Sequence, residues 1–139
     1  MTKQTPSSDT PPNEAPATRV TAMPGDANPY GDIFGGWLMS QMDLAAGLFA
    51  SRLVRGRAVT VAVDAMSFLR PVSVGDEVSV YCSVERRGRT SLSLAVQAWR
   101  RDRHSDAAEM VTQGRFTFVA VGPDRRPAVI AWGDAAEAP

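Results

Sequence analysis

Asp43 stands out because it is a carboxylate inside a long apolar segment. It follows Met42 and precedes Leu44, and residues 36–52 otherwise read as a helix with little polar face. Removing a carboxylate from water is costly unless the group is hydrogen-bonded, paired with a charge or shifted in pKa. Asp43 is therefore expected to have a partner or a shifted pKa, with an acid that faces solvent as the alternative.

Two glycines, Gly35 and Gly36, precede this apolar segment. Glycines before a long apolar run predict a tight turn that leads into a helix, whose first backbone N–H groups have no partner within the helix. Such a helix end attracts oxygen atoms and negative charge. The sequence thus predicts N–H donors at the start of the helix that carries Asp43.

The elements that position these groups follow from the periodicity of apolar residues. Apolar side chains alternate with others over residues 59–66, which predicts a strand after the helix. Three more strands with short connections predict an antiparallel meander. The predicted elements are a strand at 18–23, a loop at 24–31, the helix at 36–52, and strands at 59–66, 77–86, 90–101 and 109–121.

This order of elements predicts an α+β fold, with an antiparallel sheet wrapped around one long central helix. A helix that is apolar nearly all round belongs in an interior. One sheet covers only one side of such a helix, so a second copy of the chain is expected to cover more of it.

The composition limits the classes of function that are open to the chain. The chain has 139 residues, enough for one domain, and 15 basic residues balance 15 acidic ones, which does not favour binding to nucleic acid or to a membrane surface. Lys3 is the only lysine, which argues against Schiff-base chemistry. Cys82 is the only cysteine, which is typical of a reducing cytoplasm and is read as a small buried side chain. We expect no metal ion, no cofactor and a cytoplasmic location.

The two ends of the chain differ from the middle. Residues 1–17 contain four prolines and little that can be buried, so they are predicted to be a disordered tail. Residues 18–121 form the single predicted domain. Residues 122–139 are rich in Pro, Gly and Ala and are predicted to be a loosely ordered tail.

Three motifs in this domain resemble a known family. They are N-P-Y-G-D-I-F-G-G-W-L-M-S-Q-M-D at 28–43, A-V-T-V-A-V-D-A-M-S-F-L-R-P-V-S-V-G-D-E-V at 58–78 and G-R-T-S-L-S-L at 88–94. Together with the order of elements, they closely resemble the hotdog-fold acyl-CoA thioesterases, in particular the YciA-like branch. The likeness runs over about a hundred residues, from Ala22 to Val121.

The resemblance implies an acyl-CoA thioester hydrolase whose active site lies between two subunits that pair their sheets edge to edge. Asp43 matches the catalytic acid, Asn28 matches the Asn before the glycines, and Gly36 matches the residue whose N–H polarises the thioester carbonyl. Asp43 would act as a general base on water, or as a nucleophile that forms a mixed anhydride. Relatives form homodimers that assemble to a hexamer, a trimer of dimers.

Further residues are candidates for binding the substrate. Gly35 shares the helix end with Gly36. Thr60 and Asp64 are predicted to share one face of their strand, opposite the valines, with a polar contact at the subunit seam as the alternative for both. Met39, Met42, Phe49, Met66 and Phe68 are read as ordinary core, with an acyl channel as the alternative.

Arginines are natural partners for the phosphates of CoA, because the guanidinium fork matches phosphate geometry. Arg70 before Pro71 and Arg89 in the G-R-T-S turn are the preferred candidates, and Thr90 and Ser91 would add hydroxyl and amide donors. The alternative for each arginine is a solvated surface charge.

Two other functions compete with hydrolysis. Dehydratases of this fold pair a His with an acid, but the only histidine, His104, lies in the charged segment R-D-R-H-S-D and is read as a solvated loop residue. The second alternative is a non-catalytic acyl-CoA-binding hotdog protein. The presence of Asn28, Gly36 and Asp43 together favours the enzyme, because binding alone needs no acid in an apolar helix.

Overall fold

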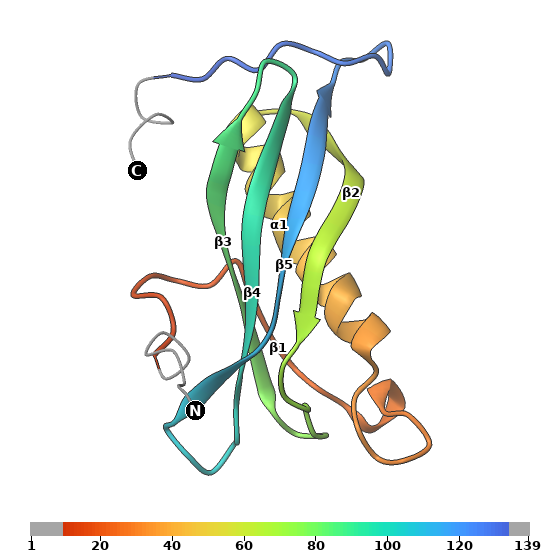
Figure 1. The fold of residues 1–139 in the computed structure, drawn as a ribbon, viewed down its shortest axis with the longest axis vertical. Coiled ribbons are helices and arrows are strands. Elements are labelled where there is room, and N and C mark those ends of the chain that lie inside the picture. The colour runs from red at the N-terminus through yellow and green to blue at the C-terminus, as the bar shows by residue number, and fades with distance from the viewer. Residues whose placement is uncertain (1–9, 134–139) are drawn as a thin grey trace.

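The computed structural model describes residues 10–133, which form one antiparallel sheet and one long helix (Figure 1). The predicted α+β hotdog architecture is confirmed, because the curved sheet lies along the helix. The elements in chain order are β1 (Thr18–Thr21), a 3-10 turn (Pro24–Asp26), α1 (Gly35–Val54), β2 (Arg57–Phe68), β3 (Glu77–Arg87), β4 (Ser91–Arg101) and β5 (Ala108–Val121).

The strand order in the sheet is β1-β3-β4-β5-β2, with every neighbouring pair antiparallel. The predicted meander of β3, β4 and β5 forms the middle of the sheet. β2 follows the helix in sequence yet lies at the far edge, paired with β5. One side of this long strand therefore has no strand partner among the described residues.

The core lies between α1 and the inner face of the sheet. Leu38, Met42 and Ala46 on the helix are buried against side chains that alternate along the strands, as the period of two predicts. Leu94 and Phe116 are paired across β4 and β5 on this face and are fully buried. This core fixes the helix along the sheet and so fixes which helical residues face outward.

Within one protomer the helix is covered on one side only, as expected for a single sheet. Leu44 is 61% exposed and Leu48 58% exposed, and Asp43 beside them is exposed as well. The reason is geometric, since a five-stranded sheet covers only one side of a cylinder. The helix ends at Val54, where Arg55 adopts a left-handed conformation (φ 56°) as its C-cap.

β2 is irregular in two places. Its register against β5 shifts between Thr60 and Ala62 and again between Asp64 and Ser67. Ala65, in the second irregularity, has φ 55°, which is uncommon for a residue other than glycine. Gly114 on β5 accommodates this bulge, because a Cβ at Gly114 would lie 2.2 Å from the sulfur of Met66.

The segment before β1 packs against the domain, so the folded part begins earlier than the predicted boundary at residue 18. The N–H of Ala17 donates to the carbonyl of Val80 at 2.7 Å, and Pro11 lies beside Trp99 on the outer face of the sheet. The prolines that suggested disorder are compatible with an extended strap. Residues 1–9 of the predicted tail lie outside the described residues.

Residues 122–132, named here the C-terminal strap, also pack more closely than predicted. Val121 and Pro127 form a β-bridge, and Ile130 is only 5% exposed. The indole N–H of Trp132 donates to the carbonyl of Gly88 at 2.7 Å. Two large apolar side chains thus anchor a segment whose Pro, Gly and Ala content suggested looseness. Residues 134–139 lie outside the described residues.

α1 is the only long helix in the described part of the chain, and it is not apolar enough to cross a bilayer.

Candidate functional site

Asp43 and Thr60 meet on the exposed side of the helix. The hydroxyl of Thr60 donates to Oδ1 of Asp43 at 2.7 Å, a short hydrogen bond to a carboxylate. Thr60 pairs with Phe118, whose side chain points into the core, so Thr60 is on the face of β2 that looks toward α1. One oxygen of the carboxylate is therefore held, and the other has no hydrogen-bond partner among the described residues.

The N-terminus of α1 offers uncapped backbone donors. Phe34 is the N-cap and its side chain makes no capping hydrogen bond, and the first turn contains no acidic residue. A Cβ built on Gly36 would meet no atom within 4 Å, so the space on the Cβ side of this residue is open. A Cβ on Gly35 would lie 3.2 Å from the ring of Phe68. The helix end can therefore receive an oxygen atom next to Gly36.

Asn28 organises the loop that precedes the helix. Its side-chain oxygen accepts hydrogen bonds from the N–H groups of Tyr30 at 2.9 Å and Asp32 at 3.0 Å, an Asx-type turn. Its backbone N–H donates to the carbonyl of Asp32, and Gly31 adopts φ 90° between them. The amide nitrogen of the Asn28 side chain has no hydrogen-bond partner among the described residues, so it remains a donor for a ligand or water.

An open depression of about 320 Å³ lies beside the helix end, between α1 and the chain after β2. Gly35 and Leu38 line it on one side, and Phe68 and Arg70 line it on the other. Phe68 is 52% exposed, so it forms a wall of this depression and not the core that the sequence suggested. The predicted helix end and the predicted Arg70 thus lie around one hollow.

The guanidinium of Arg70 is engaged within the protomer. Its Nη1 donates to the carbonyl of Met110 at 2.6 Å, and its Nε lies 3.2 Å from Glu109. A guanidinium with these partners ties the end of β2 to β5. A CoA phosphate would therefore have to compete with the carbonyl of Met110 and the carboxylate of Glu109 for the guanidinium of Arg70.

Thr60 and Asp64 do not share a face, so that prediction is wrong. The bulge between Thr60 and Ala62 inserts one residue and reverses the alternation beyond it. Asp64 consequently pairs with Arg115 on the outer face, where its carboxylate lies 3.7 Å from the guanidinium, which also binds Glu85 at 2.6 Å. This position on the edge strand is compatible with the notion of a polar contact at a subunit seam, which stays a prediction for Asp64.

Arg89 and Thr90 lie in the turn between β3 and β4, and Ser91 begins β4, at the end of the sheet opposite the start of α1 (Figure 1). Arg89 is exposed, and the hydroxyl of Ser91 accepts a hydrogen bond from Arg86 at 3.4 Å. The C-terminal strap holds this turn through the carbonyls of Gly88 and Arg89. Sequence reasoning did not predict this contact. The only signal for it was the presence of two large apolar side chains, Trp132 and Ile130, in the C-terminal segment.

The protomer cannot bring its own helix end and its own Asp43 to one carbonyl group. Asp43 follows Gly36 by seven residues on the same helix, which is about 10 Å along the axis. A catalytic group must come within about 3 Å of the atom on which it acts. The two predicted halves of the site therefore lie on one helix but too far apart to serve one substrate.

The remaining candidates lie elsewhere. His104 is exposed in the loop between β4 and β5, as predicted. Cys82 is buried in the core, where burial, with a further contribution from the charge of Glu14, raises the pKa of its thiol to about 12. Both positions match the sequence expectations that these residues are not catalytic.

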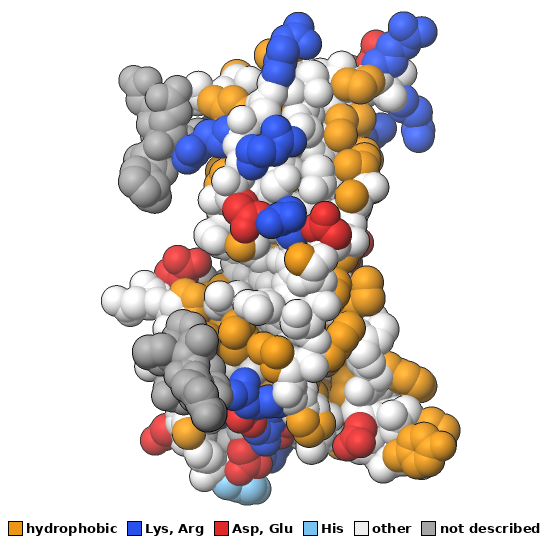
Figure 2. All heavy atoms as spheres, in the orientation of Figure 1, with side chains coloured by type: hydrophobic (Ala, Val, Ile, Leu, Met, Phe, Trp, Pro, Cys, Tyr) orange, Lys and Arg blue, Asp and Glu red, His pale blue; other side chains and the backbone are white. Residues whose placement is uncertain are grey.

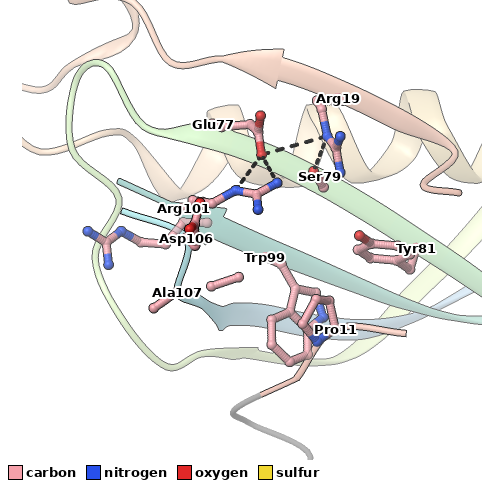
Figure 3. Close-up of a pocket in the computed structure, with 11 residues that line it drawn as sticks. Pro11, Arg19, Glu77, Ser79, Tyr81, Trp99, Arg101, Asp106 and Ala107 are labelled. Carbon is pink, nitrogen blue, oxygen red and sulfur yellow. Dashed lines mark hydrogen bonds and ion pairs between the residues drawn. The ribbon is translucent and has the colours of Figure 1, made fainter. Parts of the chain in front are cut away.

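A further pocket, of about 140 Å³, lies on the face of the sheet away from the helix (Figure 3). Tyr81 and Trp99 line it, and Arg19 and Arg101 converge on Glu77 at its rim. These arginines already have a carboxylate partner, and the sheet separates the pocket from Asp43. The pocket is therefore not part of the candidate site.

Comparisons with known proteins agree with this architecture. A model of the thioesterase superfamily matches residues 30–107, more than half of the chain. The acyl-CoA thioester hydrolase YciA of Salmonella typhimurium is 46% identical over 112 residues, which cover 78% of this chain and 84% of the relative. A Zymomonas mobilis protein named as an uncharacterised acyl-CoA thioester hydrolase is 48% identical over 127 residues, covering 91% of this chain and 85% of the relative.

Solved structures show the same fold. A hexameric thioesterase of Yersinia pestis superposes with a TM-score of 0.80 and 41% identity, covering 88% of this chain and 99% of that chain. The resemblance that the motifs indicated is thus confirmed, and the chain belongs to the thioesterase superfamily as a hotdog-fold homologue of YciA.

Proposed function

We propose that the protein hydrolyses acyl-CoA thioesters to a carboxylic acid and free CoA. The observation that carries this proposal is the combination, on one helix, of uncapped N–H donors beside open space at Gly36 and a carboxylate at Asp43 held by Thr60. The relatives named acyl-CoA thioester hydrolases support the same activity. The protein is an oligomer that acts on acyl-CoA.

The active site is completed by a second copy of the chain. Because Gly36 and Asp43 are about 10 Å apart along one helix, the N–H donor and the carboxylate for one thioester come from different protomers. In a two-fold dimer each helix contributes its N-terminus to one site and Asp43 to the other. One interface between two protomers therefore forms two equivalent active sites.

The edge strand β2 is the surface for this pairing. Val59 is 40% exposed and Val61 55% exposed on a strand whose outer edge has no partner among the described residues. A long edge strand with apolar side chains is a ready template for another strand. Pairing of two β2 strands joins the sheets, brings the two helices together and covers Leu44 and Leu48. We propose that three such dimers form a hexamer, and the thioesterase of Yersinia pestis with this fold is hexameric.

The reaction begins when the thioester carbonyl oxygen accepts the N–H of Gly36. Asp43 of the other protomer removes a proton from water, the water oxygen attacks the carbonyl carbon, and negative charge develops on the carbonyl oxygen. The C–S bond then breaks, and the CoA thiolate takes the proton. Asn28 donates its free amide N–H to the water or to the carbonyl.

Attack by Asp43 itself, with a mixed anhydride as the intermediate, is the second route. A single turnover in labelled water tests the second route. General-base catalysis places the label directly in the released acid and none in the enzyme. An anhydride that water opens at the Asp43 carbon places an unlabelled oxygen of Asp43 in the acid of the first turnover and the label in the enzyme, so label in Asp43 establishes the second route.

Release of free thiol from acyl-CoAs of graded chain length tests the function. We expect turnover by the wild-type protein, and loss of about 10³-fold in kcat for Asp43→Ala with the hexamer preserved. Absence of turnover with every acyl-CoA, together with tight binding of acyl-CoA, would establish the alternative, a non-catalytic binding protein. An unchanged rate for Asp43→Ala would exclude the proposed role of this carboxylate. The cytoplasmic location remains a prediction from the single cysteine.

A further inference from the structure

A groove of about 270 Å³ lies between the second half of α1 and the chain that precedes β1. This chain runs along the edge of the sheet beside β3, where the N–H of Ala17 donates to the carbonyl of Val80 (Figure 1). The groove is named here the helix groove, and it is lined by residues 14–17, Leu48, Phe49, Arg52 and Cys82. Its walls thus come from three parts of the chain, namely the segment before β1, the helix and β3.

The helix groove is separate from the candidate reaction site. Arg52 follows Asp43 by nine residues, which is about two and a half helical turns, so the two side chains leave the helix on opposite sides. They are also about 14 Å apart along the axis. The strand order places β1 and β3 at one side of the sheet and β2 at the other. The proposed pairing through β2 therefore leaves the helix groove open to solvent.

The inside of the helix groove is apolar. Phe49 and Ala17 pack against the edge of the core, and Leu48 forms an exposed apolar wall. Cys82 lies at the base and is only 5% exposed. Burial, with a further contribution from the charge of Glu14, raises the pKa of its thiol to about 12, so this group is uncharged at neutral pH. The helix groove therefore offers favourable contacts to a hydrocarbon chain.

The rim of the helix groove carries a guanidinium. Arg52 lies in the last turn of α1, is exposed and has no hydrogen bond or ion pair among the described residues. On the face of the sheet away from the helix, by contrast, Arg101 binds Glu77 and Arg115 binds Glu85. Figure 2 shows basic side chains beside acidic ones in the middle and lower parts of that face. A guanidinium above an apolar groove fits a carboxylate with an apolar tail, because the guanidinium fork matches the two carboxylate oxygens.

We propose that the helix groove binds a free fatty acid, with its carboxylate on Arg52 and its alkyl chain against Leu48 and Phe49. The choice of ligand rests on the proposed function, because a hydrolase of acyl-CoA releases acids of this class. A water molecule takes about 30 Å³ in the liquid and a methylene group is of similar size, so the groove of about 270 Å³ accommodates about nine such groups. The helix groove is thus a second site for the acid product, apart from the site that cleaves the thioester.

Calorimetry with octanoate tests this site. We expect the wild-type protein to bind one octanoate in each helix groove, and Arg52→Gln to weaken this binding about tenfold, since a hydrogen-bonded charge is lost. The matched control is Arg103→Gln, an exposed arginine in the loop between β4 and β5, which leaves the affinity unchanged. Neither variant should change kcat or KM for acyl-CoA. Absence of octanoate binding to the wild-type protein, or equal affinity of the wild-type protein and Arg52→Gln, would overturn the inference.

Glu14 gives a second variant with the opposite sign. It is the one acidic residue among those that line the helix groove, so it opposes an anionic ligand. We expect Glu14→Gln to strengthen octanoate binding about twofold to fivefold, the range of an exposed charge pair. Octanamide has the same tail without the charge, and its affinity should be the same in the wild-type protein and in both variants. Shifts of the octanoate affinity in the same direction for Glu14→Gln and Arg52→Gln would contradict the proposed placement of the carboxylate.

The length of the alkyl chain tests the size of the helix groove. From hexanoate to octanoate and decanoate, each added methylene group should tighten binding about twofold to fourfold, because it is partly or fully removed from water. Dodecanoate should gain little over decanoate, since the groove is then filled. A steady gain up to dodecanoate would mean that the chain lies on another surface, and it would overturn the assignment to the helix groove.

These binding measurements need no turnover, so they separate the inference from the proposed function. A protein that hydrolyses acyl-CoA but binds octanoate equally well with and without Arg52 contradicts only the inference. A protein whose octanoate binding depends on Arg52 as described, but which hydrolyses no acyl-CoA, contradicts only the hydrolase function. The Tm of each variant, compared with that of the wild-type protein, verifies that the substitution leaves the fold intact.

Discussion

At the scale of the residue, the hydrogen bond between Thr60 and Asp43 decides how the carboxylate is presented. The bond of 2.7 Å occupies Oδ1 and leaves the second oxygen for water. It also joins the helix to the edge strand, so the position of the carboxylate depends on two elements. In the proposed mechanism, a carboxylate held in this way meets the substrate without first being ordered, which lowers the barrier of the reaction.

Replacing Thr60 tests this arrangement. Thr60→Val keeps the shape of the side chain and removes the donor, so we expect kcat to fall about tenfold, the equivalent of one lost hydrogen bond to a charged group. Thr60→Ser keeps the donor and should retain most of the activity. Equal rates for the two variants in the thiol-release assay would mean that the hydrogen bond does not position Asp43.

Cys82 gives a prediction about pH. Burial raises the pKa of its thiol from 9.0 to about 12 in the folded protein, so the folded state keeps the proton that the unfolded chain loses. The stabilising contribution is complete below pH 9.0 and is lost as the pH rises toward 12. At about one pH unit above the ordinary pKa, the loss is about 1.4 kcal/mol.

Urea unfolding at pH 8 and pH 10 checks this prediction in the wild-type protein and in Cys82→Ala. The cavity left by alanine lowers the free energy of unfolding at both pH values by the same amount. The wild-type protein should lose about 1.4 kcal/mol more than the variant between the two pH values. Parallel losses in the two proteins would show that the thiol ionises as easily in the folded state as in the unfolded chain.

At the scale of the element, β2 shows what sequence reasoning can predict and what it cannot. The alternation over residues 59–66 correctly predicts the strand, because side chains alternate between the two faces. It wrongly predicts that Thr60 and Asp64 share a face, because a bulge leaves no mark in the alternation itself. The bulge depends on β5, where Gly114 makes room, and so it is a property of the strand pair.

Gly114→Ala tests the fit of the second bulge. The new methyl group would lie 2.2 Å from the sulfur of Met66, so that side chain must move, and we expect a loss of about 1 to 3 kcal/mol in the free energy of unfolding. The double variant Gly114→Ala/Met66→Ala should lose less than the sum of the two single variants. Strict additivity in denaturant unfolding would show that the close approach is not what demands glycine.

The other elements also include some that the sequence predicts and some that it does not. The helix and the meander are predictable, because their apolar patterns are long and their ends carry turn residues such as Gly56 and Gly88. The packing of the C-terminal strap was not predictable, because it depends on two contacts, those of Ile130 and Trp132, with a turn some forty residues earlier. The motifs placed Asn28, Gly36 and Asp43 on the correct elements, but the distance between Gly36 and Asp43 required the structure.

At the scale of the whole molecule, the surface left uncovered by one protomer explains why a partner is needed. Leu44 and Leu48 are exposed on the helix beside Asp43, and the apolar edge of β2 runs next to them. Exposed apolar side chains that adjoin a free strand edge are typical of an interface between subunits. The same surface carries the carboxylate, so in the proposed dimer assembly and catalysis depend on one contact.

Mixing two inactive variants tests the shared active site most directly. Gly36→Pro removes the N–H donor at a helix position that tolerates proline, and Asp43→Ala removes the carboxylate, so each protein alone should be inactive. Gly36→Ala, which keeps the N–H and has room for its methyl group, is the matched control and should remain active.

After unfolding and refolding together in equal amounts, half of the dimers contain one protomer of each variant. Each mixed dimer has one site with an intact Gly36 from one protomer and an intact Asp43 from the other. The account predicts recovery of about a quarter of the wild-type thioesterase activity, from the two-fold symmetry of the dimer. Mixed oligomers that stay inactive, although they form and remain folded, would contradict the claim that each active site takes Gly36 and Asp43 from different protomers.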